Sequence, residues 1–531
     1  QRIFRDAGNH LEFASEFVRG QCYLAIAAPL RRMLHGLVAD RLLAQDTAAE
    51  PIPGLEIAWH LVRADRLAEA IPFLLAGGRE SIRRGAPHEA DLALSTGLPA
   101  LTGAARRTAI LLLAEARQEL GRWEDSLRVL DLAEEPFSES EACECEVMRI
   151  VARRWLGLLS DPVLEEAGTR LCDIAESDVD VEVRVKALSA MPYLLTQTRA
   201  PSGLMRLGAA IVSVESCRMD GFQRLHLLLA KAWRADQLRD TDSARRLIEE
   251  AVCLMDTLGA GSTIAVRILV GAGILHVEEG SYQAAVPLLQ RAVGMAKKID
   301  NALHFSAAAA ALALAEGRLG HTNQQLRWAQ AAIEGLPVGD AGIVALTAVY
   351  EKGLALIFDE RSIEAVSLLS DTEPRFGRQR SSWAMQAWKL MKADILALAG
   401  ETRKAFVQAR QATSGRNEEL LVNDFAGPFM RWKALVAIRE GTAAPCVREA
   451  IRQLGNLERF HAKDQVEILA SIALLEAELG IDTTDRRKDV ERRLRALPNS
   501  IRILIKRLGV LPEHGEAEGT ARGQRTPPTE S

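Results

Sequence analysis

The sequence predicts an all-α fold, a right-handed superhelical solenoid of tandem antiparallel helix pairs. Three observations predict it. Short turns interrupt the helical runs at a nearly constant spacing. Aromatic residues make up only 5% of the chain, and no long stretch alternates β-branched with polar residues as a strand would. Because a solenoid packs each unit only on its neighbours, a chain of 531 residues needs no division into separate globular domains.

The spacing of the turns is the strongest of these signals. Successive turns lie 39 to 41 residues apart, at Gly121, Ser160, Ala200, Asp240, Gly280, Gly320, Glu360, Gly400, Gly441 and Gly480. A period of about 40 residues has room for two helices and two turns, so each unit is expected to be one helix pair.

The turns contain residues suited to ending one helix and starting the next. In residues 275–293, Gly280 is expected to adopt the left-handed conformation that closes a helix, and Ser281 is expected to cap the following one. Thr322 and Gln325, after the turn at Gly320, have the spacing of a capping box.

The second helix of each pair has small and large side chains at fixed distances from the turn. A small residue recurs five positions on, at Ser126, Ala285, Ala365 and Ala405. A Leu or Ala recurs nine positions on, at Leu130, Leu289, Leu369 and Ala409. The small residues are expected to let the two helices approach closely while the larger ones fill the groove. Pro72 and Pro287 each lie seven residues after a turn, which predicts a kink or a late helix start.

A five-residue pattern joins these turns to a known repeat. The pattern G-x-aromatic-x-x-Ala/Ser-x-x-x-Leu-x-x-Ala occurs as Gly280, Tyr282, Ala285, Leu289 and Ala292, and again as Gly121, Trp123, Ser126, Leu130 and Ala133. It resembles the turn and second helix of tetratricopeptide repeats, although the usual period of that family is 34 residues. The longer period is similar to that of the helical arm of bacterial signal-transduction ATPases, including the maltose-regulon activator and the large LuxR-type regulators.

The first 50 residues differ from the repeats. An apolar segment with Phe13 and Phe17 leads to a helix that contains Arg31, Leu34 and His35. This stretch resembles the end of the winged-helix module of those ATPases; a first capping helix pair is the alternative. Gln1 stands where an initiator Met would, so we expect a longer polypeptide with an ATPase domain upstream.

The solenoid is expected to cover residues 51–510 and a disordered tail residues 511–531, where almost no apolar side chains are available for burial. Basic residues concentrate in 483–509, but Asp485, Asp489 and Glu491 interleave with them. That mixture favours a solvated helix face with intrahelical ion pairs over a site for an acidic partner or nucleic acid. No helix-turn-helix of the LuxR type follows.

A search for chemistry assigns no catalytic residue, cofactor or metal. The chain has no G-x-x-x-x-G-K-S/T phosphate loop. Cys143 and Cys145 lack the second pair of ligands that a structural zinc needs. His276, Glu278 and Glu279 precede the Gly280 turn and are interpreted as a polar helix end.

The composition limits the partners and the compartment. A net charge of −5 argues against nucleic-acid binding by the whole chain. Seven scattered cysteines suggest no disulfide framework, and no apolar run is long enough for a membrane span, so we expect a cytoplasmic protein. The eight Trp residues are interpreted mainly as core anchors, with Trp383 and Trp388 as candidates for lining a groove.

Together these features predict a non-enzymatic binding protein. The first helices of successive pairs are expected to line a concave surface for a protein, a peptide or a small effector. The resemblance implies a sensor or interaction arm of a signal-transduction ATPase or transcriptional regulator. A free-standing scaffold for protein partners is the alternative, because it uses the same surface.

Overall fold

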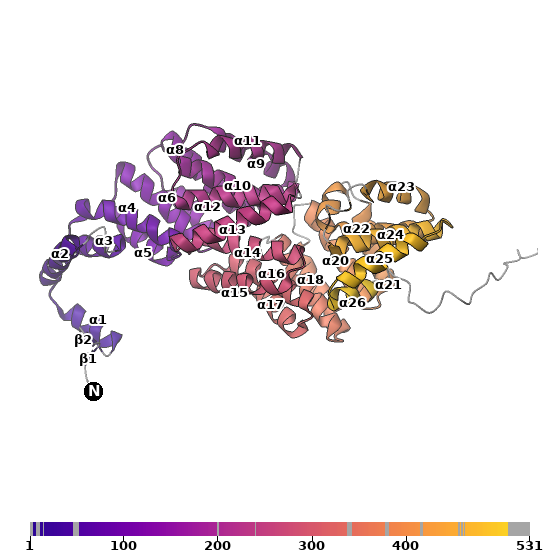
Figure 1. Cartoon of the computed structure of the whole chain (residues 1–531). Helices are drawn as coiled ribbons and strands as arrows, with labels where there is room; N and C mark the ends of the chain where they lie inside the picture. Colours follow the sequence, from indigo (N-terminus) through magenta and orange to yellow (C-terminus); the bar gives the residue numbers. More distant parts are fainter. Residues whose placement is uncertain are drawn as a thin grey trace, which may run out of the picture.

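The computed structural model describes residues 4–6, 11–13, 15–45, 53–198, 201–238, 240–336, 342–376, 382–414, 418–454, 457, 460 and 462–507. Within these ranges the chain is a succession of antiparallel helices, which confirms the all-α solenoid (Figure 1). The predicted tail, 511–531, lies outside the described residues.

The N-terminal segment contains a small hairpin that the sequence analysis missed. Strands β1 (Phe4–Asp6) and β2 (Leu11–Phe13) pair antiparallel, and helices α1 (Glu16–Ala25) and α2 (Ala28–Gln45) follow. Three-residue strands are too short to produce a recognisable alternation in the sequence. The hairpin and α1 extend away from the other helices in Figure 1.

The repeated unit is a helix pair throughout. An entry region of α3 (Gly54–Arg63), α4 (Leu67–Arg83), α5 (Pro87–Gly97) and a 3-10 turn comes first. We call the first helix of each later pair an A helix: α6 (Gly103–Glu119), α8 (Glu139–Trp155), α10 (Val181–Thr198), α12 (Gly221–Gln237), α14 (Thr263–Glu278), α16 (Ala302–Leu319), α18 (Ile343–Phe358), α20 (Ser382–Leu398), α22 (Glu418–Arg439) and α24 (Ala462–Glu478).

The second helix of each pair, the B helix, packs on the outer side of the array. The B helices are α7 (Trp123–Leu130), α9 (Asp161–Glu176), α11 (Pro201–Glu215), α13 (Thr241–Leu258), α15 (Tyr282–Ile299), α17 (Thr322–Gly335), α19 (Ser362–Phe376), α21 (Thr402–Thr413), α23 (Ala443–Leu454) and α25 (Thr484–Ala496). A last helix, α26 (Asn499–Arg507), follows.

The turns between A and B helices lie where the sequence spacing predicts them. Seven of the marked residues have a left-handed backbone, with φ between +59° and +85°: Gly121, Gly280, Gly320, Glu360, Gly400, Gly441 and Gly480. Ser160 and Asp240 instead stand at the N-caps of α9 and α13. Ala200 lies outside the described residues.

The predicted capping hydrogen bonds are wrong in two turns. Ser281 occupies the N-cap of α15, but its hydroxyl accepts no capping hydrogen bond. His321, not Thr322, is the N-cap of α17, and Gln325 donates to the buried Glu351 carboxylate instead of completing a box. Asp240 does cap α13, since its longer carboxylate reaches the Ser243 amide at 3.1 Å.

The helices with an internal proline do not begin late. Pro72 lies inside α4, which starts at Leu67, and Pro287 lies inside α15, which starts at Tyr282. Both helices therefore start directly after their turns, and the proline removes one hydrogen bond of the helix instead of delaying it.

Close contact between A and B helices depends on the small residues. Ser126, Ala285, Ala365 and Ala405 are fully buried, as the repeat pattern predicts. A β-carbon at Gly273 of α14 would come within 2.5 Å of the Leu289 side chain of α15. One hydrophobic core runs through these contacts from Trp123 to Ile505.

The array winds into a superhelix whose successive turns touch. The Asn301 side-chain amide donates to the carbonyl oxygen of Glu119 at 2.7 Å, and the Ser500 hydroxyl donates to that of Arg318 at 2.5 Å. Both hydrogen bonds join residues 182 positions apart. We therefore call residues 103–300 the N-terminal turn and residues 302–507 the C-terminal turn.

Candidate functional site

Each superhelical turn encloses a cavity on its inner face, and the A helices supply most of the lining. The cavity of the N-terminal turn has a volume of about 140 Å³ and is lined mainly by α6, α8, α10, α12 and α14. The cavity of the C-terminal turn has a volume of about 590 Å³ and is lined mainly by α16, α18, α20 and α24, together with α14 from the end of the N-terminal turn. The expectation that A helices form the concave surface is therefore met in both turns.

The N-terminal cavity is filled by charges that neutralise one another. The Lys186 ammonium lies 2.9 Å from Glu115, 2.8 Å from Glu144 and 3.3 Å from Glu182. Burial opposes the charge of Lys186, but these carboxylates outweigh burial and hold its pKa well above the ordinary value. Burial also raises the pKa of Glu182, yet Lys186 and nearby arginines outweigh that effect and lower it to about 2.

Other groups at this cavity are kept neutral or nearly so. Burial raises the pKa of Glu119 to about 7, although the Thr263 amide and hydroxyl donate to it at 2.7 and 2.6 Å. Burial, aided by Arg267, lowers the pKa of His226 and His304 to about 3. Both imidazoles are therefore neutral at physiological pH.

Large aromatic side chains close the remaining space. Trp123 and Trp155 stack with their rings 6.1 Å apart, and the Arg83 guanidinium lies 5.1 Å from the centre of the Phe222 ring. All four residues line the N-terminal cavity. What remains is a small polar space between paired charges.

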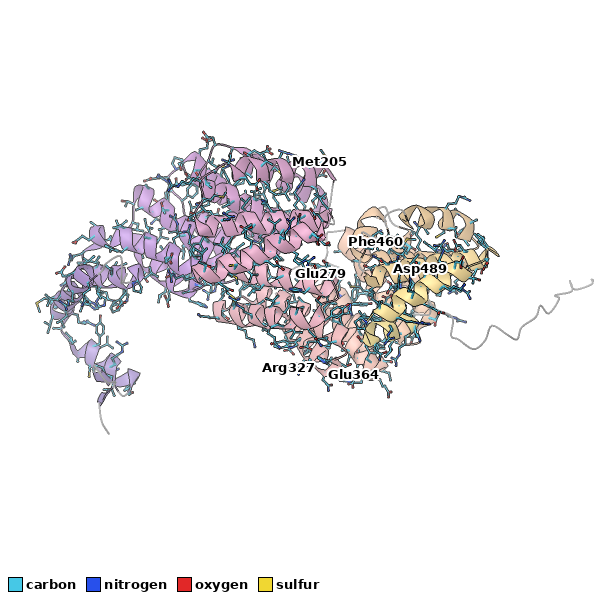
Figure 2. All side chains as sticks on the ribbon, viewed as in Figure 1. Met205, Glu279, Arg327, Glu364, Phe460 and Asp489 are labelled. Carbon is cyan, nitrogen blue, oxygen red and sulfur yellow. The ribbon has the colours of Figure 1, made fainter. Side chains whose placement is uncertain are left out.

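The C-terminal cavity has a different lining. Its apolar surface comes from Leu314, Leu390, Met391, Pro428 and Leu497. Its carboxylates are Glu278, Glu279, Glu351, Asp394 and Asp464, and its cations are Arg318 and Lys463. Figure 2 labels Glu279 at the centre of the molecule, beside the junction of the two turns, whereas Arg327 and Glu364 lie at the outer edge.

A buried network supports one wall of this cavity. Arg431 of α22 is 0% exposed; its guanidinium donates to Glu467 at 3.0 Å and also to Asp394. The Trp432 indole and the Tyr350 hydroxyl donate to the two oxygens of Asp394 at 2.6 and 2.9 Å. Four A helices, α18 to α24, are thereby joined through one carboxylate and one guanidinium.

A second ion pair at the cavity joins α16 to α18. Arg318 of α16 lies 3.3 Å from Glu351 of α18, and the Gln325 amide donates to the same carboxylate at 2.7 Å. Residues 496–498, between α25 and α26, also line the cavity, and Ser500 fastens α26 to α16 through the Arg318 carbonyl. The chain end described by the structure therefore lies over the cavity and contacts both of its sides.

The two tryptophans proposed for a groove have different positions. Trp388 is 2% exposed and stacks on Phe376, with ring centres 4.2 Å apart, so its indole lies inside the core. Trp383 begins α20, but its side chain lies outside the described residues.

Other residues singled out in the sequence form local contacts. Cys145 is buried beside the Arg149 guanidinium at 3.3 Å, while Cys143 is partly exposed. His276 lies 3.9 Å from Glu279, which also pairs with Arg245 at 3.0 Å. Within the described part of the chain, no group of three or more His, Cys, Asp or Glu side chains is placed to hold a metal ion.

The basic C-terminal helices pair largely within themselves. Arg492 and Arg493 donate to Asp489, Arg495 lies 3.7 Å from Glu491, and Arg486 forms two hydrogen bonds to Glu476 of α24. These contacts support the interpretation as a solvated helix face.

Sequence reasoning missed the residues that shape the C-terminal cavity. Glu351 and Asp394 are buried carboxylates in largely apolar A helices, and Tyr350, Asp394, Arg431 and Glu467 follow one another at 36 to 44 residues. Charged residues inside apolar helices at the repeat spacing are a signal that could have identified this surface.

Comparisons with known proteins find similarity among solved structures only. No protein-family profile matches it, and no curated protein matches its sequence. Among solved structures it is similar to a Rap protein complexed with competence and sporulation factor, at 11% identity and a TM-score of 0.46, covering 69% of this chain and 99% of that one. It is also similar to the Cut9-Hcn1 assembly of the APC/C, at 10% identity and a TM-score of 0.47, covering 90% and 84%.

A third similar structure is a signal-transduction ATPase with a tetratricopeptide repeat sensor from Pyrococcus horikoshii. The identity is 12% and the TM-score 0.39, with 80% of this chain covered. The chain spans 59% of that protein's length. Separately, no helix in the described ranges is both long and apolar enough to cross a membrane.

Proposed function

We propose that the chain is a sensor arm that binds a peptide, a protein segment or a small effector in the C-terminal cavity, on behalf of a signal-transduction ATPase or transcriptional regulator. The observation that carries the proposal is the cavity itself. Its volume of about 590 Å³ lies within the range of roughly 300–1,000 Å³ that is typical of ligand pockets. Its lining combines apolar side chains with a few fixed polar groups, which is the usual composition of such pockets.

The position of α26 supports a route for signalling. A ligand in the cavity would touch residues 496–498, and α26 is held to α16 by the hydrogen bond between Ser500 and Arg318. Ligand affinity that differs between a closed and an open position of α26 would shift the balance between them. The arm would then pass ligand occupancy to whatever packs on these two helices.

A free-standing scaffold is the second candidate, and α2 has an exposed surface on which a partner could dock. Leu30, Met33, Leu37 and Val38 recur at helical spacing on α2, and all four are exposed. An apolar stripe of this kind is typical of a surface that docks against another protein or domain. The same stripe is compatible with an ATPase domain of the same polypeptide, so the gene sequence preceding the Gln1 codon tests which candidate holds.

The binding proposal is tested by filling the cavity. Thr347 faces the cavity from α18, and Thr347→Trp would place an indole in the space without removing a core contact. We expect peptides or effectors retained by the full chain to be lost by this variant, measured by affinity selection and mass spectrometry. Arg327→Trp, on the outer face of α17, is the matched control and should retain them. Equal retention by Thr347→Trp would contradict the proposal.

A further inference from the structure

The charges around the C-terminal cavity are unequal. Five carboxylates and two cations line it. Arg318 is paired with Glu351, Lys463 lies 3.1 Å from Glu467, and Glu279 is paired with Arg245. Arg431, behind the wall, is shared between Asp394 and Glu467. Once these pairs are formed, every cation is engaged and the carboxylates are still in excess.

Asp464 is one of the carboxylates outside these pairs. It lies on α24, is partly buried, and lines the cavity. Among the described residues, no Lys, Arg or His nitrogen lies within 4.0 Å of its oxygens, although Lys463 is its neighbour in sequence. The Lys463 ammonium is directed to Glu467 instead.

The α22 backbone beside Asp464 donates no hydrogen bond to it within the described part of the chain. A β-carbon at Gly427 of α22 would lie 2.6 Å from the Asp464 Oδ1 atom, so that oxygen rests directly against the α22 backbone. The next residue of α22 is Pro428, which lines the cavity and has no N–H group to donate. Leu497 and Pro498 also line the cavity. Leu497 supplies an apolar side chain, and Pro498, like Pro428, has no N–H group to donate.

We propose that the C-terminal cavity selects a peptide with a basic side chain, and that Asp464 receives its ammonium or guanidinium group while Leu390, Met391 and Leu497 contact its methylene chain. Lysine and arginine have this combination of an apolar stem and a charged end. An acidic side chain is excluded because it would meet the excess of carboxylates. This inference rests on the proposed function, since it specifies the ligand of the same cavity.

The experiment uses the full chain and three pools of capped hexapeptides. One central position is fixed as arginine, glutamine or glutamic acid, and the other positions are random. Retained peptides are quantified by affinity selection and mass spectrometry. We expect the arginine pool to be retained about tenfold more than the glutamic acid pool, and Asp464→Asn to remove most of that preference, because a hydrogen bond to a charged group changes affinity by about this factor.

Matched variants separate the possible failures. Asp371→Asn removes the same charge from the outer groove between α17 and α19 and should leave the preference unchanged. If Thr347→Trp abolishes retention but the arginine and glutamic acid pools are retained equally by the unmodified chain, the cavity binds ligands and the assignment of a basic ligand is wrong. If Thr347→Trp leaves retention of every pool unchanged, or no pool is retained, both the inference and the proposed function fail. Circular dichroism of each variant checks that it is folded.

Discussion

The two superhelical turns are built from the same repeating helix pair, but the side chains that line their cavities differ. In the N-terminal turn, Lys186 gathers three carboxylates and large aromatic rings take up the space, which leaves a cavity of about 140 Å³. In the C-terminal turn, Arg431 is fully buried behind the cavity lining, and the cavity has a volume of about 590 Å³. One repeat architecture can therefore produce either a closed charged core or a ligand-sized pocket.

The position of the central cation accounts for this difference. Lys186 projects from α10 among Glu115, Glu144 and Glu182, and this ion cluster lines the N-terminal cavity. Arg431 instead lies behind the lining of the C-terminal cavity, paired with Asp394 and Glu467. Both clusters join three consecutive A helices, but only the first places its cation at the cavity surface.

The largest expected effect comes from removing Arg431. Arg431→Met would leave the buried Asp394 without its cation and Glu467 with Lys463 alone, which typically costs about 3–5 kcal/mol. Urea unfolding of the full chain measures the loss, and hydrogen exchange should place it in α20 to α24. Arg495→Met, which removes an exposed partner of Glu491, serves as the control and should change little. An unfolding curve for Arg431→Met that matches the original would mean that the wall does not depend on this ion network.

Removing Lys186 tests the other turn in the same way. Lys186→Met would leave three carboxylates near the axis, with a loss again of about 3–5 kcal/mol, but confined to α6 to α12. The loss should be smaller at pH 5 than at pH 8, because carboxylates without their cation bind protons more readily. Faster hydrogen exchange in the C-terminal turn would contradict this prediction, because it would show that the stability of that turn also depends on Lys186.

Glu119 gives a pH dependence to the N-terminal turn alone. Burial raises its pKa from 4.5 to about 7. Its contribution to stability is therefore fully present below pH 4.5 and is lost as the pH rises through about 7. Glu119 therefore makes the N-terminal turn less stable at pH 8.5 than at pH 5, by on the order of a few kcal/mol. His226 and His304 act in the opposite direction, because their lowered pKa values cost stability as the pH falls below 6.5. Relative to the original chain, Glu119→Gln should therefore gain stability as the pH rises from 5 to 8.5, measured by urea unfolding followed by hydrogen exchange; an unchanged difference between the two proteins would contradict the assignment.

The smallest effect concerns the attachment of α26. Ser500→Ala removes the hydrogen bond to the Arg318 carbonyl, which contributes about 0.5–1.5 kcal/mol. Amide exchange should accelerate in α26 and in residues 496–498 without a change in the N-terminal turn. Ser362→Ala, at the start of α19, is a control that should leave α26 unaffected.

The sequence predicts the helix pairs well because their signals are local. A left-handed glycine at a turn lets one helix end and the next run back along it, as at Gly280. A small residue five positions later, such as Ala285, lets the two helices approach closely. The spacing of residues does not determine individual side-chain torsion angles, so it could not predict whether the Ser281 hydroxyl accepts a capping hydrogen bond. The hairpin of β1 and β2 is too short for its pattern to be recognised.

The cavity could not be predicted from one sequence in the same way. Its lining comes from helices between α14 and α26, and it exists only because the superhelix returns on itself, as the contact between Ser500 and Arg318 shows. The aromatic content of α20 suggested a groove at Trp388, but stacking on Phe376 places that indole in the core. The spacing of Asp394, Arg431 and Glu467 is a signal for one wall, but Asp464, in the first turn of α24, differs little in sequence from an ordinary charge at a helix start.

The central claim is that the C-terminal turn binds ligand and the N-terminal turn does not. Hydrogen–deuterium exchange of the full chain, with and without a saturating concentration of the arginine-containing peptide pool, tests it most directly. We predict protection in α16, α18, α20 and residues 496–507, with no change in α6 to α12. Protection confined to the N-terminal turn, or to the exposed face of α2, would contradict the claim.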